Sequence, residues 1–332
     1  MIEYFFSLPK LIELTIEQQT VLNEYAPIAL SGGAGTGKSV VSIFRHLKNY
    51  ENGNSSILIT YTKTLQKYLF QSVKQLNPEA SKRVHSANGC LISKNKNSCS
   101  NVYEIIIDEA QDLSYEQIET IKYFAKHISY GADFNQQLYE QKITKQKMDE
   151  LFPNNESYHL EQNFRNTREV LNFTKALTPN LKISSNVEKS GNKPVFFVGS
   201  GSVEKILELI EVFRSSKENI AILVPFVRDV DYYYDQLKDK VECSYYHNKL
   251  QEVDFTISNI HITTFKSSKG LEFDTVIIPN FEDFYRNIEI SEKTFVKEND
   301  YYVAFTRAKN NLFIISTIDF NLNNNVCDIE EF

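Results

Sequence analysis

Two short stretches of this sequence contain residues of the types and spacing that act on phosphate groups. In "SGGAGTGKS", residues 31–39, Gly32 is followed by four residues and then by Gly37, Lys38 and Ser39, the spacing of a phosphate-binding loop. Backbone N–H groups of such a loop surround the phosphates, the lysine reaches the β and γ oxygens, and the serine hydroxyl binds Mg²⁺. We therefore predict ATP binding by the loop residues Gly32, Gly33, Ala34, Gly35, Thr36, Gly37, Lys38 and Ser39.

The second stretch, "IIIDEAQDLS" at residues 105–114, places carboxylates directly after a β-branched run. Polar residues at the carboxyl end of a strand in an open parallel sheet face the ligand crevice, so Asp108 is a candidate ligand of Mg²⁺. Its neighbour Glu109 is then the candidate for orienting or deprotonating the water that attacks the γ-phosphate. The alternative role for a polar residue in this place is to cap the next helix, and this role stays open for Asp112 and Ser114.

Short apolar strands alternate with amphipathic helices along both halves of the chain. In the first half, the strand patterns "PIALSG", "SILITY", "YEIIID" and "ISYGAD" alternate with helical patterns. The helical pattern between "YEIIID" and "ISYGAD" predicts a helix over residues 115–127. The pattern restarts after a loop at residues 152–157. Such alternation indicates β-α units and a parallel sheet with helices on both faces. We therefore predict an α/β protein with two parallel-sheet domains, over residues 1–157 and 158–332.

The composition is that of a globular protein, with 332 residues of which 42% are hydrophobic and 24% charged. The opening residues lack the pattern of a signal peptide, and no apolar run approaches the roughly 18 residues that a membrane span needs. We therefore expect a cytoplasmic protein that does not act at a membrane. Four cysteines match no zinc or redox spacing and are expected to be reduced and mostly buried: Cys90, Cys99, Cys243 and Cys327.

Charge is unevenly distributed along the chain. The net charge of −7 argues against a protein that coats nucleic acid over its whole surface. Between Thr60 and Tyr103, however, there are seven basic residues and one acidic residue, Glu79. A local basic face of this kind can follow a phosphate backbone. On charge alone a merely solvated face explains it as well, and both explanations stay open.

The phosphate-binding loop and "IIIDEAQD" together resemble the ATPase core of superfamily 1 helicases of the UvrD/Rep/PcrA type. This resemblance implies two RecA-like P-loop NTPase domains with the ATP site in the cleft between them. It also implies roles for further residues that contact the nucleotide. Gln18 in "LTIEQQTVL" would read adenine, Phe164 in "LEQNFRN" would stack on adenine, and Glu272 would lie near the ribose. Gln136 in "GADFNQQLY" would sense the γ-phosphate, while Arg165 in "LEQNFRN" and Arg307 in "YYVAFTRAK" would stabilise phosphoryl charge in the transition state.

The same resemblance implies contacts with single-stranded DNA, or with duplex DNA that has an overhang. "ITYTKTL" and "VHSA" bracket the basic stretch and look like strand-contacting motifs, which makes Thr60, Tyr61 and His85 candidates. "TTFKSSKGLEFD" adds Thr264 and Lys266. Because the chain contains no tryptophan, base stacking is expected from rings such as Tyr139.

Departures from the family pattern limit the implied activity. Larger relatives carry long insertions after the "HS" motif and before "TTFKSSKGLEF", whereas here His85 and Asp108 are only 23 residues apart. We therefore expect a minimal ATPase and translocase, moving 3′ to 5′ and acting with a protein partner such as a nuclease in DNA repair or defence against phage. The alternative is a nucleotide-gated regulatory subunit that controls a partner enzyme without unwinding DNA itself.

Overall fold

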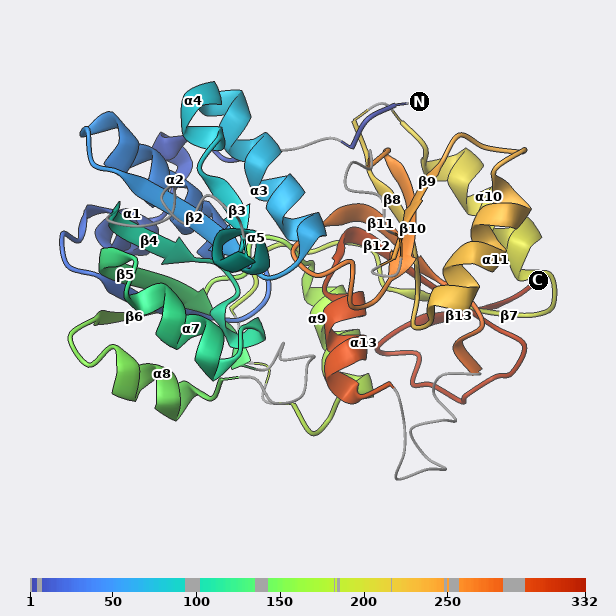
Figure 1. Ribbon diagram of the computed structural model, residues 1–332. Helices are drawn as coiled ribbons and strands as arrows, with labels where there is room; N and C mark the ends of the chain where they lie inside the picture. Colours follow the sequence, from blue (N-terminus) through green and yellow to red (C-terminus); the bar gives the residue numbers. More distant parts are fainter. Residues whose placement is uncertain are drawn as a thin grey trace. The chain divides into compact units, whose positions relative to one another are not determined.

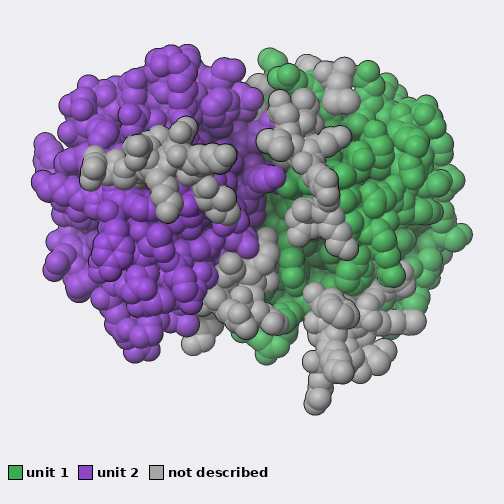
Figure 2. Space-filling view, in the orientation of Figure 1, with its two compact units in different colours: residues 1–5, 164–183, 187–332 green, residues 6–163, 184–186 purple. Residues whose placement is uncertain are grey.

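The computed structural model of this chain describes residues 2–4, 8–92, 102–134, 143–181, 183, 186–215, 217–247, 250, 257–282 and 296–332. They divide into two compact units, coloured separately in Figure 2. Unit 1 comprises residues 1–5, 164–183 and 187–332, and unit 2 comprises residues 6–163 and 184–186. Each unit has its own sheet and its own hydrophobic core.

The described part of unit 2 contains a six-stranded sheet in which neighbouring strands are parallel (Figure 1). In spatial order the strands are β3 (Val84–Ser86), β2 (Ser56–Thr60), β4 (Val102–Ile107), β5 (Ala125–Ala132), β1 (Ile28–Gly32) and β6 (Glu156–Leu160). Only β5 separates β1 from β4. Because parallel strands end at the same edge, the phosphate-binding loop after β1 and the carboxylates after β4 emerge on the same side of the sheet.

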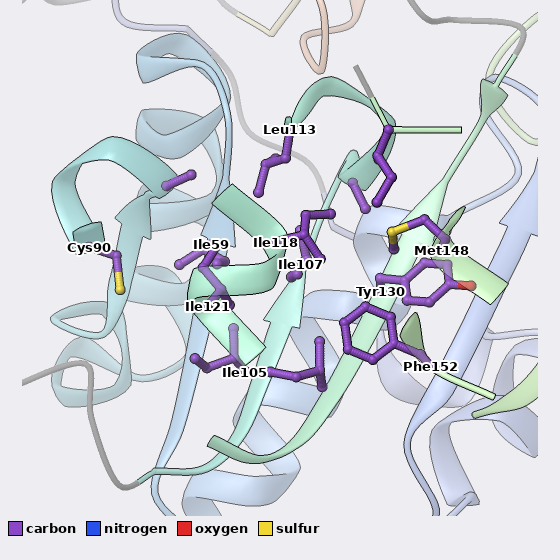
Figure 3. Packing of buried hydrophobic residues seen from close by; sticks show 14 of the residues in the cluster. Ile59, Cys90, Ile105, Ile107, Leu113, Ile118, Ile121, Tyr130, Met148 and Phe152 are labelled. Carbon is purple, nitrogen blue, oxygen red and sulfur yellow. The ribbon is translucent and has the colours of Figure 1, made fainter. Parts of the chain in front are cut away.

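Helices cover both faces of this sheet. One face is covered by α1 (Ile16–Asn23), α2 (Lys38–Glu51), α3 (Lys63–Leu76) and α4 (Pro78–Ser81), and the other by α5 (Ala87–Ile92), α7 (Tyr115–Lys122) and α8 (Lys145–Leu151). Successive side chains of a strand point to opposite faces. Ile105 and Ile107 of β4 therefore pack against Ile118 and Ile121 of α7 (Figure 3), whereas Glu104 faces α2.

The described part of unit 1 contains a seven-stranded sheet, again with parallel neighbours. Its order is β13 (Asp328–Glu331), β7 (Val195–Val198), β12 (Ala308–Ser316), β11 (Phe273–Ile278), β8 (Ile220–Val224), β10 (Ile260–Thr264) and β9 (Ser244–Tyr246). The helices α10 (Ser202–Phe213) and α11 (Val227–Leu237) pack on one face. On the other lie α9 (Arg168–Leu177) and α13 (Glu298–Phe305), joined by an edge-to-face contact between Phe173 and Phe305 with ring centroids 5.2 Å apart. The prediction of two parallel-sheet α/β domains is confirmed.

Two predicted boundaries differ from the structure. The expected division after residue 157 falls inside β6, which pairs with β1 over Ile28–Gly32, so the crossing into unit 1 follows Asn163. The helix expected over residues 115–127 ends at Lys122, because Ala125–His127 pair with β4 as the beginning of β5. Amphipathic spacing alone did not separate the last helical turn from the start of the next strand.

Two expectations from composition also meet the structure. Cys90, Cys243 and Cys327 are buried, as expected, and none of these three is in a disulfide bond, whereas Cys99 lies outside the described residues. Among the described helices, none is long and apolar enough to cross a lipid bilayer.

Candidate nucleotide-binding site

The phosphate-binding loop connects β1 directly to α2. Gly37 precedes the first helical residue with a left-handed backbone (φ 90°), and a Cβ there would come within 2.3 Å of the Gln18 side-chain nitrogen. Gly32 at the end of β1 also has a positive φ, and a Cβ there would lie 2.7 Å from the Leu160 carbonyl oxygen. Only glycine fits both positions without strain, because it carries no Cβ.

The Lys38 ammonium group lies within the loop. Its Nζ donates to the carbonyl oxygens of Gly32 and Gly33, at 2.9 and 2.8 Å. The loop is further held by Asn163, whose side-chain nitrogen donates to the Ala34 carbonyl at 2.8 Å. Sequence reasoning missed Asn163, since no local signal links it to a loop more than a hundred residues earlier.

Gln18, the predicted adenine-reading residue, has its amide engaged in local contacts. Its Oε1 accepts from the Thr15 backbone in a capping box at the start of α1, and its Nε2 donates to the Thr36 carbonyl at 3.2 Å. The capping box is the common use of glutamine three residues after threonine. The structure thus places Gln18 against the phosphate-binding loop, and its contact with adenine stays a prediction.

Ser39 and Asp108 form the centre of a small group of oxygens. Ser39 Oγ donates to Asp108 Oδ2 at 2.7 Å, and Ser42 Oγ donates to Asp108 Oδ1 at 3.2 Å. Asp108 is almost fully buried, and burial, followed by the charge of Glu109, raises its pKa to about 7. Carboxylate and hydroxyl oxygens are the ligands that Mg²⁺ takes from proteins, and a divalent cation would favour the charged form of this carboxyl group. The residues present therefore fit a Mg²⁺ site.

Glu109 follows Asp108 with an unusual backbone. Its φ of 58° and ψ of 48° are left-handed although it carries a full side chain. The Gln111 side-chain nitrogen donates to Glu109 Oε2, and Gln111 Oε1 accepts from the Asp133 backbone at 3.1 Å. Gln111, which sequence reasoning missed, therefore links Glu109 to the end of β5.

Asp112, the third carboxylate of this stretch, does not cap the next helix. The N-cap of α7 is Ser114, whose Oγ accepts from the Gln117 backbone at 3.2 Å. Asp112 is buried in the short 3-10 turn η2 (Ala110–Asp112).

In unit 1 the candidate arginines converge on one loop. Arg165 Nε pairs with Glu272 Oε2 at 3.0 Å. The buried Arg307 guanidinium donates to the Leu271 carbonyl at 3.2 Å, and also to Val303 and Thr306. Residues 271–272 therefore contact both arginines.

The segments that carry these arginines are tied together by Asn166. Its side-chain nitrogen donates to the carbonyl oxygens of Thr306 and Ala308, the two residues that flank Arg307, at 3.1 and 2.6 Å. Phe164, which is predicted to stack on adenine, is 45% exposed, whereas Gln136 lies outside the described residues.

The candidate DNA contacts differ in their exposure. Thr60 is fully buried and its Oγ1 has no hydrogen-bond partner among the described residues, while Thr264 is buried and bonded to Ser267. Tyr61 is partly buried and packs against the core of unit 2. His85 is also partly buried, and this burial, together with the charge of Arg83, lowers the pKa of its side chain.

The Lys266 side chain is 43% exposed, with an Asp300 carboxylate oxygen 4.0 Å from its Nζ. Tyr139 lies outside the described residues. Neither threonine hydroxyl reaches the surface here, so all of these DNA contacts stay predictions.

Comparison with solved structures defines the class of fold. S. cerevisiae Dbp5 bound to RNA and ADP BeF3 is similar over 97% of this chain and 90% of the other, with a TM-score of 0.61 and 14% sequence identity. At that identity the likeness concerns the fold alone. The two units have the RecA-like fold that the sequence predicted.

The family follows from the sequence comparison. The family "UvrD-like helicase C-terminal domain" matches residues 38–318, which is most of the chain. The chain therefore belongs to the UvrD-like superfamily 1 helicases.

Two named relatives agree with this assignment. One, from Acanthamoeba polyphaga mimivirus, carries a provisional name as ATP-dependent DNA helicase R568 and is 29% identical over 66% of this chain and 35% of its own length. The other, from Mycoplasma pneumoniae, carries a provisional name as a DNA helicase and is 22% identical over 65% of this chain and 44% of its own length. The matched region therefore spans less than half of either relative.

Proposed function

We propose that this chain hydrolyses ATP with Mg²⁺ and couples the reaction to binding of single-stranded DNA. The observation that carries the proposal is the hydrogen bond from Ser39 to Asp108, which joins the start of α2 to the end of β4, with Glu109 beside it and Lys38 held by the carbonyls of the phosphate-binding loop. Family membership supports the same activity, since both named relatives are called helicases.

Each residue of this group has a defined task in the proposal. Ser39 and Asp108 would hold Mg²⁺, which supplies positive charge against the phosphate oxygens. The γ-phosphate would take the Lys38 ammonium from the carbonyl groups of Gly32 and Gly33, because an ionised acceptor makes the stronger hydrogen bond. Glu109 would orient the attacking water and receive its proton.

Arg165 and Arg307 would stabilise the charge on the transferred phosphoryl group, as arginines do in P-loop ATPases. In the structure Arg165 is paired with Glu272, and Arg307 donates to main-chain carbonyls of its own unit. ATP binding would therefore exchange the carbonyl partners of Arg307 for phosphate oxygens, whereas Arg165 would stay paired with Glu272 through Nε and meet phosphate with its terminal nitrogens. The contacts of Gln18 and Phe164 with adenine and of Glu272 with ribose belong to the same proposal.

The hydrolytic proposal is tested with Glu109→Gln. This change keeps the shape of the side chain but removes the group that receives a proton, so we expect ATP turnover to fall by about 100-fold or more while nucleotide affinity is kept. Turnover is measured by phosphate release, and affinity by equilibrium binding of a fluorescent ATP analogue. Glu116→Gln, the same change on the exposed first turn of α7, is the matched control and should have no effect. Unchanged hydrolysis in Glu109→Gln would show that another group is the base.

Coupling to DNA is tested by adding single-stranded oligonucleotides to the wild-type chain. A motor should show strong stimulation of ATP turnover, whereas the alternative, a nucleotide-gated switch that controls a partner enzyme, should show none.

The connections at which larger relatives carry insertions are short in this chain: residues 87–101 join β3 to β4, and residues 247–259 join β9 to β10. We therefore propose translocation, 3′ to 5′ by family resemblance, with a protein partner such as a nuclease supplying the grip needed to open duplex DNA. A role in repair or in defence against phage rests on the same resemblance.

A further inference from the structure

Residues 2–4 are part of unit 1, far in sequence from the rest of it. The Tyr4 backbone N–H donates to the Ile257 carbonyl at 2.9 Å, and the Asn259 N–H donates to the Ile2 carbonyl at 2.9 Å. An antiparallel bridge between Glu3 and Ser258 lies between these two bonds. The segment is thus attached by a single antiparallel bridge beside residues 257–259.

This attachment buries the Tyr4 side chain next to the loop that precedes β11. Tyr4 is 3% exposed, and its ring meets Phe273 edge to face with centroids 5.7 Å apart and planes at 89°. The hydroxyl group donates to the Glu272 carbonyl and accepts from the Glu272 N–H, the second bond at 3.2 Å. A phenol can do both at once. One side chain, 268 residues earlier in the sequence, therefore binds both main-chain polar groups of Glu272.

Glu272 is the residue that holds Arg165. Its Oε2 lies 3.0 Å from Arg165 Nε, and the two side chains are only 23% and 16% exposed. On the other side of the same loop, Leu271 accepts from the Arg307 guanidinium at 3.2 Å. Arg307 thus secures residue 271 independently, whereas Tyr4 binds the main chain of Glu272 itself.

We propose that Tyr4 is a positioning residue for ATP hydrolysis, because it sets the place of the Glu272 carboxylate and, through it, the direction of the Arg165 guanidinium. The inference rests on the proposed ATPase activity and deepens it, since neither the phosphate-binding loop nor the arginine motifs include this residue. In this proposal Tyr4 acts through Glu272, to whose main chain it is bonded, and not on the nucleotide itself. A displacement of about 1 Å in a group that acts on the transition state lowers rates by up to about 100-fold, so a loosened Glu272 should be measurable in turnover.

The simpler explanation is that Tyr4 only stabilises unit 1. Two changes separate the explanations: Tyr4→Phe removes the hydroxyl and keeps the ring on Phe273, while Glu272→Ala removes the carboxylate and keeps the main-chain groups that Tyr4 binds. If the hydroxyl only stabilises unit 1, Tyr4→Phe should have the same effect with and without the Glu272 carboxylate. If the hydroxyl acts through that carboxylate, Tyr4→Phe should lower ATP turnover only where Glu272 is present.

The experiment measures kcat and KM for ATP, and the thermal unfolding midpoint, in the full chain, in Tyr4→Phe, in Glu272→Ala and in the double variant. We expect Tyr4→Phe to lower kcat about threefold to tenfold in the wild-type background and by less than twofold in the Glu272→Ala background. The midpoint should fall by the same amount in both backgrounds. Tyr123→Phe, at a tyrosine that is 80% exposed, should change neither quantity.

An equal loss of kcat in both backgrounds, or no loss in either, would overturn the positioning role while leaving the ATPase proposal intact. A wild-type chain without ATP hydrolysis, with or without single-stranded DNA, would instead overturn the proposed function and this inference with it. The two failures are therefore distinguishable in one set of measurements.

Discussion

Glu109 is held in a backbone conformation that residues with a side chain rarely adopt. A left-handed non-glycine residue costs of the order of 1–3 kcal/mol and persists only where the surroundings stabilise it. Here Gln111 supplies a side-chain donor to the Glu109 carboxylate and an acceptor to the Asp133 backbone. The strained backbone of Glu109, the proposed catalytic base, and the buried Gln111 amide that bonds to its carboxylate are both expected where the direction of that carboxylate matters.

Gln111 can therefore be tested by two substitutions with different losses. Gln111→Glu keeps an acceptor for the Asp133 N–H but sets a buried carboxylate against that of Glu109, so ATP turnover should fall about tenfold or more and the free energy of unfolding should fall as well. Gln111→Ala should lower both turnover and the free energy of unfolding, the latter by about 1–3 kcal/mol, because the buried Asp133 N–H loses its acceptor. Turnover and urea unfolding are measured for both.

The control for these changes is Gln75→Ala, at an exposed residue near the end of α3, which should alter neither quantity. Full activity of both Gln111 variants would mean that Glu109 is positioned without the amide.

At the scale of elements, a buried ion pair fixes α2 to β4. Arg45 Nε lies 2.8 Å from Glu104 Oε1, and the two side chains are 6% and 1% exposed. The same guanidinium donates to the carbonyls of Glu24 and Ala26, just before β1. Because α2 begins with Lys38 and Ser39 and β4 leads into Asp108, this pair sets the spacing of the elements that carry the nucleotide site.

Removing one partner of this pair should be costly. Glu104→Ala leaves the Arg45 charge buried without its carboxylate, and we expect the free energy of unfolding to fall by about 3–5 kcal/mol. The double change Arg45→Met with Glu104→Leu should lose less, since neither charge is then buried. Urea unfolding of the full chain measures both.

Glu79→Ala breaks the exposed pair between Glu79 and Lys82 and should cost under about 1 kcal/mol. If Glu104→Ala cost no more than Glu79→Ala, the buried pair would have no part in holding α2 to β4.

At the scale of the whole molecule, each unit contains a histidine with no exposed surface, His46 in unit 2 and His261 in unit 1. Burial lowers the pKa of both side chains, that of His261 to about 3 from an ordinary value of 6.5. Between those values the unfolded chain binds more protons than the folded chain, so stability rises with pH across this window. Each of these histidines should therefore contribute less stability as the pH falls below about 6.5, whereas the raised pKa of Asp108 acts in the opposite sense in unit 2.

We expect the slope of the unfolding midpoint against pH between pH 5 and pH 7 to be smaller in His261→Asn than in the wild-type chain, because asparagine keeps a polar atom near Ser244 but cannot be charged. Thermal unfolding over this range measures the slope, and the slope rather than the absolute midpoint is compared, because the substitution has its own packing cost. His159→Asn, at an exposed histidine, should keep the wild-type slope. An unchanged slope in His261→Asn would mean that this histidine does not contribute.

The sequence by itself determined the parts of the molecule whose information is local. A phosphate-binding loop and a strand followed by carboxylates are each contiguous, so their chemistry and their place between a strand and a helix could be predicted from short windows. The two parallel sheets followed from the alternation of patterns. The edge strands β3, β6, β9 and β13 were not predicted, because β3 and β9 have only three residues each and the partly exposed β6 and β13 lack a clear apolar pattern.

Only the tertiary structure decided which side chains hold the candidate site. Asn163, Asn166, Gln111 and Tyr4 act on main-chain groups of other segments, and no residue spacing records such a contact. Tyr4 shows the physical reason most clearly: a hydroxyl can bind the backbone of Glu272 across 268 residues of sequence only after residues 2–4 have paired beside Ser258 in unit 1. Short-range patterns therefore predicted what the site contains, and long-range folding decided how it is positioned.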